Sequence, residues 1–452
     1  MSPPAPALLD ELLEEIFLRL PPDEPEHLVR ASLSSKRWLG LLSGARFRGR
    51  YRELHGAPPM LGFLYFFHSN SRPETEDNIP HFLPTTKFRA CIPDDDWLGY
   101  SALDCRHGRV LIGEVAYTPM TLVVWDPMTG CRRELEAPPL VDNTYGAAVV
   151  CAVAGCDHHT CHAGPFQVVF VGLDHCHEDE CVARACVSLP VTSNHSKPGL
   201  QSPFDKWSKP CSALHLDSDL YIYEAPPVFV QDALHFKLCN CAEHRVVGIL
   251  KYDMSTNSLS LIDMPLAWSV NANASILMAM EDDSLGFAHV YGLILNLWSR
   301  HMGSDGVASW TQRTVINIKD ILPIRNPNKG LRLIGSVEGT DIIFVTTDLG
   351  IYKINLKSLQ WKREWERKKF RAFIPYMSFH NPQGLRNGGD KKNLLEGSSA
   401  EMRAHDAASV APIGQLPRIT QAGEDDLESE SYEDPESESE SEEDLESESE
   451  ED

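Results

Sequence analysis

Hydrophobic residues near the start of the chain recur with the spacing of an amphipathic helix. In LLDELLEEIFLRLPP, which runs from Leu8 to Pro22, apolar side chains lie three or four positions apart and would share one helix face. Charged residues fill the opposite face, and two consecutive prolines prevent the helix from continuing. The pattern therefore predicts one strong helix that ends before Pro21.

The segment that follows predicts two more short helices. In EPEHLVRASLSSKRWLGLLSGARFRGRY, the spacing of the apolar residues fits two further short helices, and Gly44 would end the second of them. Three helices in about fifty residues form a bundle that is marginally stable alone. Their apolar stripe is wider than the bundle can bury, so the module either caps the next domain or docks a partner protein.

From Gly62 to about Phe379 the pattern changes to short apolar runs separated by Gly, Asp, Asn and Pro, which is typical of β-strands. Three stretches resemble one another as strand–turn–strand units: LVVWDPMTGCRREL, GILKYDMSTNSLSLI and GIYKINLKSLQWKRE. Asp126, Asp253 and Asn355 stand at their turns, where such side chains can accept bonds from the turn backbone. Units recurring at roughly 45 to 65 residues predict a β-propeller of about six blades, with a β-sandwich array as the alternative.

The end of the chain is compositionally different. Residues 424–452 contain 18 of the 65 acidic residues and no Lys or Arg, which leaves −6 of the net charge of −24 for the rest of the chain. A serine and glutamate repeat of this kind cannot bury a core, so we expect a disordered tail from 381 to 452. Neither part carries the basic face that a nucleic-acid-binding protein needs.

Composition also restricts the cellular setting. No apolar run approaches the roughly 18 residues of a membrane span, and the start MSPPAP lacks the basic region of a signal peptide. The twelve cysteines are therefore expected to be reduced thiols of a cytoplasmic or nuclear protein.

One group of cysteines and histidines raises the question of a metal site. Six cysteines lie between Cys151 and Cys186, but the apolar run from Phe166 to Val171 separates them into two groups. If that run is a strand, the groups lie roughly 20 Å apart at ~3.3 Å per residue. A complete zinc ligand set is then available only within one loop, from Cys156, His158, Cys161 and His162. We expect no metal and no cofactor, with buried thiols and loop residues as the simpler interpretation.

The N-terminal residues resemble an F-box, whose pattern is a Leu-rich helix, then Leu-Val-Arg, then Lys-x-Trp. LLDELLEEIFLRLPP and HLVRASLSSKRW follow this pattern, with Leu9 where many F-boxes have proline. Downstream, CRHGRVLI, LVVWDPMTGCRRELEAP, CDHHTCHAGPFQVVFVG and FIPYMSF resemble plant F-box proteins with an F-box-associated β-propeller. The resemblance implies an F-box-like module over 5–52 and a propeller over 60–380, which precede the tail expected from composition over 381–452.

The resemblance also implies a function. Such proteins dock on a Skp-type adaptor, which links them to a cullin–RING ubiquitin ligase, and their propeller binds the protein to be ubiquitinated. The residues that match the motif are candidates for adaptor contact or its support: Leu9, Leu12, Leu13, Ile16, Leu20, Leu28, Val29, Lys36 and Trp38.

Two other functions remain open from the sequence. The helices could pack internally in a propeller scaffold that recruits no ligase. A propeller hydrolase would need acids or histidines clustered on its loops, but no phosphate loop, nucleophile elbow or HExxH motif is present. The acidic runs at 94–96 and 281–283 are more simply turns. We therefore expect a non-catalytic protein whose substrate cannot be read from the sequence.

Overall fold

The computed structural model describes residues 9–56, 58–66, 81–90, 100–114, 120–128, 130–138, 144–153, 156, 165–177, 180–190, 207–217, 219–265, 270–303, 306–327, 330–366 and 372–379. The tail expected over 381–452 and the loop residues His158, Cys161 and His162 lie outside this part of the chain.

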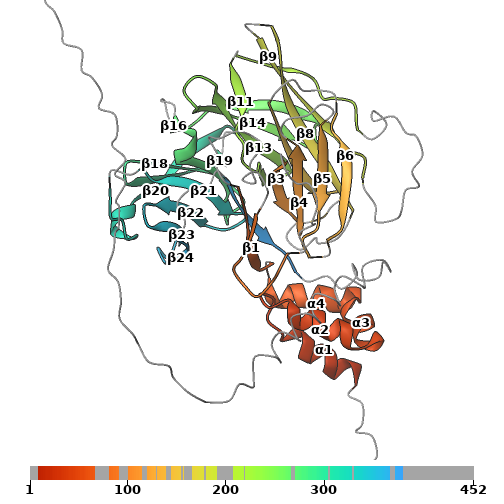
Figure 1. Ribbon diagram of the computed structural model, residues 1–452. Helices are drawn as coiled ribbons and strands as arrows, with labels where there is room; N and C mark the ends of the chain where they lie inside the picture. The colour runs from red at the N-terminus through yellow and green to blue at the C-terminus, as the bar shows by residue number, and fades with distance from the viewer. Residues whose placement is uncertain are drawn as a thin grey trace, which may run out of the picture. The chain divides into compact units, whose positions relative to one another are not determined.

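A helical module occupies residues 9–56 and has one helix more than the sequence predicts. Its helices are α1 (Asp10–Leu18), α2 (Glu26–Ser34), α3 (Lys36–Leu42) and α4 (Ala45–His55) (Figure 1). Gly44 does follow α3, with its N–H bonded to the Leu41 carbonyl at 3.1 Å, but it also precedes α4 as the N-cap. Helix α4 contains four arginines and one glutamate, and only Phe47 and Tyr51, four positions apart, are buried.

Side chains from all four helices form the core of the module, together with one residue from the far end of the described chain. The buried members are Leu13, Phe17, Leu18, Leu28, Ala31, Leu42, Phe47, Tyr51 and Phe379. The hydroxyl of Tyr51 donates to the Leu20 carbonyl, and the His55 ring donates to the Leu18 carbonyl, both at 2.8 Å. These two bonds satisfy carbonyls at the C-terminal end of α1, which have no partner within the helix.

Six antiparallel sheets follow and form the blades of a β-propeller (Figure 1). Blade 1 contains β3 (Tyr100–Arg106), β4 (Arg109–Glu114), β5 (Thr121–Trp125) and β6 (Arg132–Glu136). Blade 2 contains β7 (Thr144–Cys151), β8 (Phe166–His177), β9 (Glu180–Val187) and β10 (Leu214–Leu216). Blade 3 contains β11 (Leu220–Ile222), β12 (Val228–Val230), β13 (Ala233–Asn240), β14 (Arg245–Asp253), β15 (Ser258–Ile262) and β16 (Val270–Asn271).

The remaining blades complete the ring. Blade 4 contains β17 (Ser275–Ala279), β18 (Leu285–Tyr291), β19 (Ile294–Met302) and β20 (Ala308–Asn317). Blade 5 contains β21 (Arg332–Val337), β22 (Ile342–Thr347), β23 (Gly350–Asn355) and β24 (Trp361–Trp365). Blade 6 combines both ends of the propeller, because β1 (Met60–Phe66) pairs with β2 (His81–Pro84) on one side and with β25 (Ala372–Met377) on the other.

The inner strands close into a ring. Strand β25 lies beside β3 and β21, β3 lies beside β7, and β17 lies between β12 and β21. In blade 3 the inner position is shared by β11 and β12, which pair with opposite ends of β13. Pairing of the first strand, β1, with the last, β25, thus closes the propeller. The six-bladed propeller predicted from the repeats is confirmed.

The three similar sequence stretches are the outer hairpins of blades 1, 3 and 5. Asp126 follows β5, and Asp253 and Asn355 are the last residues of β14 and β23. Each accepts one or two backbone N–H groups of the next three residues at 2.9–3.1 Å. The turn chemistry predicted for these residues is therefore present. Within the described part of the chain, no helix is long and apolar enough to cross a membrane.

Candidate docking surface on the helical module

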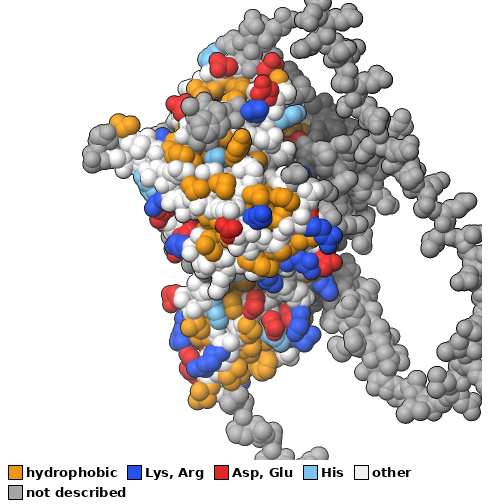
Figure 2. Space-filling view, turned by 90° about the vertical axis from the view of Figure 1, so that its left-hand side faces the viewer, with side chains coloured by type: hydrophobic (Ala, Val, Ile, Leu, Met, Phe, Trp, Pro, Cys, Tyr) orange, Lys and Arg blue, Asp and Glu red, His pale blue; other side chains and the backbone are white. Residues whose placement is uncertain are grey.

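Helix α1 exposes a stripe of large apolar side chains. Leu9, Leu12 and Ile16 are 66%, 51% and 48% exposed. Their spacing of three and four positions places them on one side of the helix. The adjacent rows, which contain Leu13, Phe17 and Leu18, are buried in the core of the module. We call Leu9, Leu12 and Ile16 the α1 stripe. Figure 2 shows apolar side chains beside charged ones at the lower end of the view, where the helical module lies.

Ion pairs hold α1 against the rest of the module. Asp10 pairs with Arg37 of α3 at 2.7 Å, and Arg50 of α4 bonds to Glu14 at 2.7 Å and to Glu15 at 2.5 Å. The hydrogen bond from Arg50 lowers the pKa of Glu15. Because Glu14 is buried, its carboxylate needs this partner more than an exposed acid would. These pairs fix the orientation of the α1 stripe.

The structure separates the nine motif-matched residues into three groups. Leu9, Leu12, Ile16 and Lys36 are exposed and can contact a partner directly. Leu20, Val29 and Trp38 are partly buried, and Leu13 and Leu28 lie in the core. The ring of Trp38 packs edge-on against the ring of Phe17, with the ring centres 5.2 Å apart, so Trp38 supports α1 from the core side. Ser35 caps α3 by accepting the Trp38 N–H at 3.1 Å.

Sequence reasoning missed several residues that shape this surface. Arg50 lies in a helix that the apolar pattern does not mark, although its run of alternating arginines is a visible signal. Leu33 of α2 is also 53% exposed, but it belongs to no motif position and lies outside the α1 stripe. Phe379 joins the core of the module from the end of the propeller, and no sequence signal links it to the helices.

A second cluster of interest lies among the inner strands of the propeller, where Asp104 and Arg106 are buried and Glu338 is exposed. Arg106, at the end of β3, bonds to Asp104 at 2.5 Å, to Glu338 beyond β21 at 3.0 Å and to the Pro227 carbonyl before β12 at 2.5 Å. The second oxygen of Asp104 accepts the N–H of Val149 in β7 at 2.9 Å. This channel cluster therefore links blades 1, 2, 3 and 5.

The environment of the channel cluster shifts its titration. Burial raises the pKa of Asp104 to about 6, against the lowering effect of the Arg106 charge and the Val149 N–H. Burial lowers the pKa of Arg106, but attraction to Asp104 and Glu338 outweighs it and raises the pKa overall. The donors and acceptors of the cluster are used on one another and on the backbone. This arrangement suits a brace across the channel.

A buried lysine occupies the junction of blades 3 and 4. Lys237 donates to the carbonyls of Ala272 and Ser275 at 2.6 and 2.8 Å and lies 3.7 Å from the ring centre of Tyr223. Burial lowers its pKa to about 7. Its bonds hold the crossover through η3 (Ala272–Ala274), so the residue has a structural role in the crossover.

The cysteine and histidine group is described only in part. Cys151, Cys181 and Cys186 are buried, as expected for thiols of a packed domain, and the nine described cysteines form no disulfide. Among the described residues, the one group of three possible ligands close enough for a metal is Glu24, Glu26 and His27 on the module surface. Acidic groups of this kind are common without an ion. The acidic run at 281–283 forms the turn between β17 and β18, as predicted.

Comparisons with known proteins bear on the two parts differently. Residues 7–48 match the family model of the F-box domain. No curated protein sequence matches the chain.

Solved propeller structures resemble the chain only weakly. The match to a luciferin-regenerating enzyme has 9% sequence identity and a TM-score of 0.33, and it covers 65% of this chain and 84% of the enzyme's chain. The match to TolB from Acinetobacter baumannii has 11% sequence identity and a TM-score of 0.36, and it covers 73% of this chain and 71% of the TolB chain. The PQQ-bound aldose sugar dehydrogenase from Streptomyces coelicolor has 12% identity and a TM-score of 0.33, with 74% and 97% covered. Similarity this low says nothing about activity.

Proposed function

We propose that this protein is a non-catalytic substrate-recognition subunit of a Skp–cullin–F-box ubiquitin ligase. Its F-box domain would dock the Skp-type adaptor, and its propeller would bind the protein to be ubiquitinated. The observation that carries the proposal is the α1 stripe, exposed on a domain that matches the F-box family. A cytoplasmic or nuclear location and the resemblance to plant proteins with F-box-associated propellers fit this function.

The exposed stripe favours docking over a purely internal role. Three large apolar side chains on one helix face, framed by ion pairs, have the layout of helix-in-groove recognition. If the helices served only to cap the propeller, these side chains would be covered by other parts of the module or the propeller. In the docking function, Leu13 and Leu28 would contribute by packing the core of the module, because neither is exposed enough for a partner to reach.

Replacing Leu12 and Ile16 with glutamate tests the docking surface. Both side chains are about half exposed, so the double variant should fold normally. Apolar anchors at the centre of an interface contribute about 1 to 2 kcal/mol or more each, and the two together about 3 kcal/mol, so affinity for a Skp-type adaptor should fall at least about 100-fold. Binding is measured by calorimetry with purified adaptor, and folding by circular dichroism and thermal melting.

Leu33→Glu is the control, because it places one glutamate on an exposed apolar position outside the α1 stripe. It should leave adaptor affinity nearly unchanged. Undiminished binding by the double variant would exclude the α1 stripe as the docking surface. Failure of the unmodified protein to bind any adaptor would instead favour the alternative function, a propeller scaffold that recruits no ligase.

A further inference from the structure

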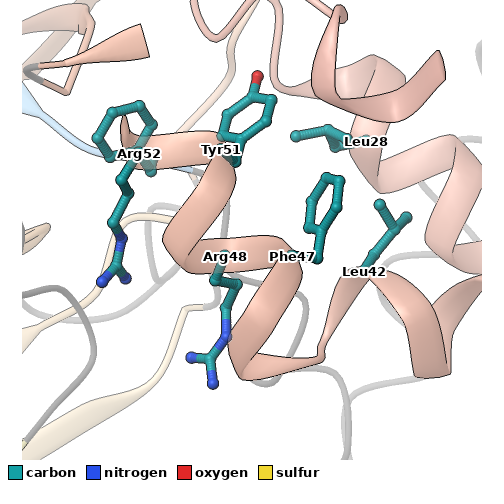
Figure 3. Close-up of a pocket in the computed structure, with 7 residues that line it drawn as sticks. Leu28, Leu42, Phe47, Arg48, Tyr51 and Arg52 are labelled. Carbon is teal, nitrogen blue, oxygen red and sulfur yellow. The ribbon is translucent and has the colours of Figure 1, made fainter. Parts of the chain in front are cut away.

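Phe379 follows the last propeller strand in sequence but packs in the core of the helical module. Its side chain is 4% exposed, and its ring lies edge-on to Tyr51 with the ring centres 6.0 Å apart. Leu28, Leu42 and Phe47 line the same site, and Figure 3 shows them pointing toward Tyr51 between the helices. The module therefore contains a residue that no continuous N-terminal segment can supply.

The chain reaches this position along a paired connection. Strand β25 runs antiparallel to β1 up to the pair Met60 and Met377. One residue further, the N–H of Ser378 donates to the Pro59 carbonyl at 3.2 Å. The segments that enter and leave the propeller are thus bonded together next to the module, and Phe379 extends beyond the last of these bonds.

Contacts lead from Phe379 to the helix that carries the docking surface. Tyr51 stacks on Phe47 with the ring centres 5.6 Å apart and contacts the His55 ring at 4.4 Å. The Tyr51 hydroxyl and the His55 ring then bond to the carbonyls of Leu20 and Leu18 at the end of α1. A small bundle has little buried surface of its own, so a large aromatic side chain added from outside matters to its stability.

We propose that Phe379 is a clasp, by which the end of the propeller completes the core of the F-box domain and fixes the orientation of the α1 stripe relative to the propeller. Phe379 is then a positioning residue. The proposed function enters only through the consequence: a fixed orientation would hold a bound substrate at a constant place relative to the adaptor.

Distance measurements in the full-length protein without adaptor test the clasp. Spin labels carried by non-canonical amino acids at Arg30 of α2 and Tyr291 of β18, both exposed, avoid the native cysteines. Phe379→Ala should broaden the distance distribution at least about twofold. Hydrogen exchange of α4 should become at least tenfold faster. Phe379→Leu refills most of the site and should restore the narrow distribution.

Phe17→Ala is the matched control, because Phe17 belongs to the same core but does not line the site of Phe379. It should speed exchange in the module without broadening the distances. An unchanged distribution in Phe379→Ala, or equal broadening in Phe17→Ala, would overturn the clasp. Should Phe379→Ala lose propeller protection in the exchange data, Phe47→Ala replaces it as the test, because it opens the same site from the module side and leaves the propeller strands unchanged.

The two proposals fail in different ways. The distances are recorded on the free protein, so they report on the clasp even if no adaptor binds. Adaptor affinity of the unmodified protein is measured separately and reports on the proposed function alone.

Discussion

Asp104→Asn tests the electrostatic balance of the channel cluster. Asparagine has nearly the same shape as aspartate, and its side-chain oxygen can still accept a bond from the Val149 N–H or from Arg106. The substitution therefore removes a fully buried charge while it leaves the packing of β3 intact. Any change in stability with pH then reports on that charge.

The size of the change in the free energy of unfolding follows from the pKa of Asp104, which burial raises from 3.8 to about 6. Because the folded-state value is the higher one, the stabilising contribution of this group is fully present below pH 3.8 and is lost as pH rises through 6. The total loss is about 3 kcal/mol, at about 1.4 kcal/mol per pKa unit. About half of it, on the order of 1 to 2 kcal/mol, falls between about pH 5 and 7.5. Asparagine does not titrate, so the variant should gain this amount relative to the unmodified protein over that interval.

Urea denaturation followed by tryptophan fluorescence at about pH 5 and pH 7.5 measures the difference. Asp253→Asn is the control. The Asp253 carboxylate accepts hydrogen bonds from Ser255, Lys251 and the Thr256 N–H, and these bonds lower its pKa. Stability from that group is lost only at more acidic pH, so the control should show no change between the two conditions.

The opposite sign would refute the reasoning. If the unmodified protein gained stability relative to Asp104→Asn as pH rises, the attraction of Arg106 would exceed the cost of burial. Arg106→Met gives an independent check, because it leaves the Asp104 carboxylate without its cation. Such a loss typically costs about 3–5 kcal/mol at neutral pH, and here it should shrink toward pH 5 as Asp104 binds a proton.

Three further predictions concern other parts of the chain. Gly350→Ala should destabilise the propeller by about 2 kcal/mol or more, since φ is +149° and a Cβ would lie 2.2 Å from a backbone oxygen of β24, whereas Gly330→Ala, with open space around it, should not. Deletion of residues 424–452 should leave the melting temperature and adaptor binding unchanged; a drop of several degrees would show that the tail docks on the folded part. Protein purified under reducing conditions should contain no stoichiometric zinc, and one equivalent lost on Cys156→Ser and Cys161→Ser would contradict this.

Much of the architecture follows from local sequence. Helix α1 and the hairpins around Asp126, Asp253 and Asn355 were predictable because helix periodicity, strand alternation and turn residues act over a few positions. The recurrence of the strand–turn–strand units along the chain was sufficient to predict a propeller of about six blades. Helix α4 was missed because its apolar positions are few and its charges pair with α1, a contact that the local pattern does not contain.

The division of the α1 face was decided only by tertiary packing. The sequence places Leu12 and Leu13 in one apolar stripe, but burial separates them, because α2, α3 and α4 cover one edge of that stripe and leave the other open. Glu338 meets Arg106 because closing the ring brings the inner strands of blades 1 and 5 close together. Phe379 reaches the module because β25 pairs with β1. Contacts between residues this far apart depend on how the whole chain closes, and the spacing of residues within any one segment carries no information about them.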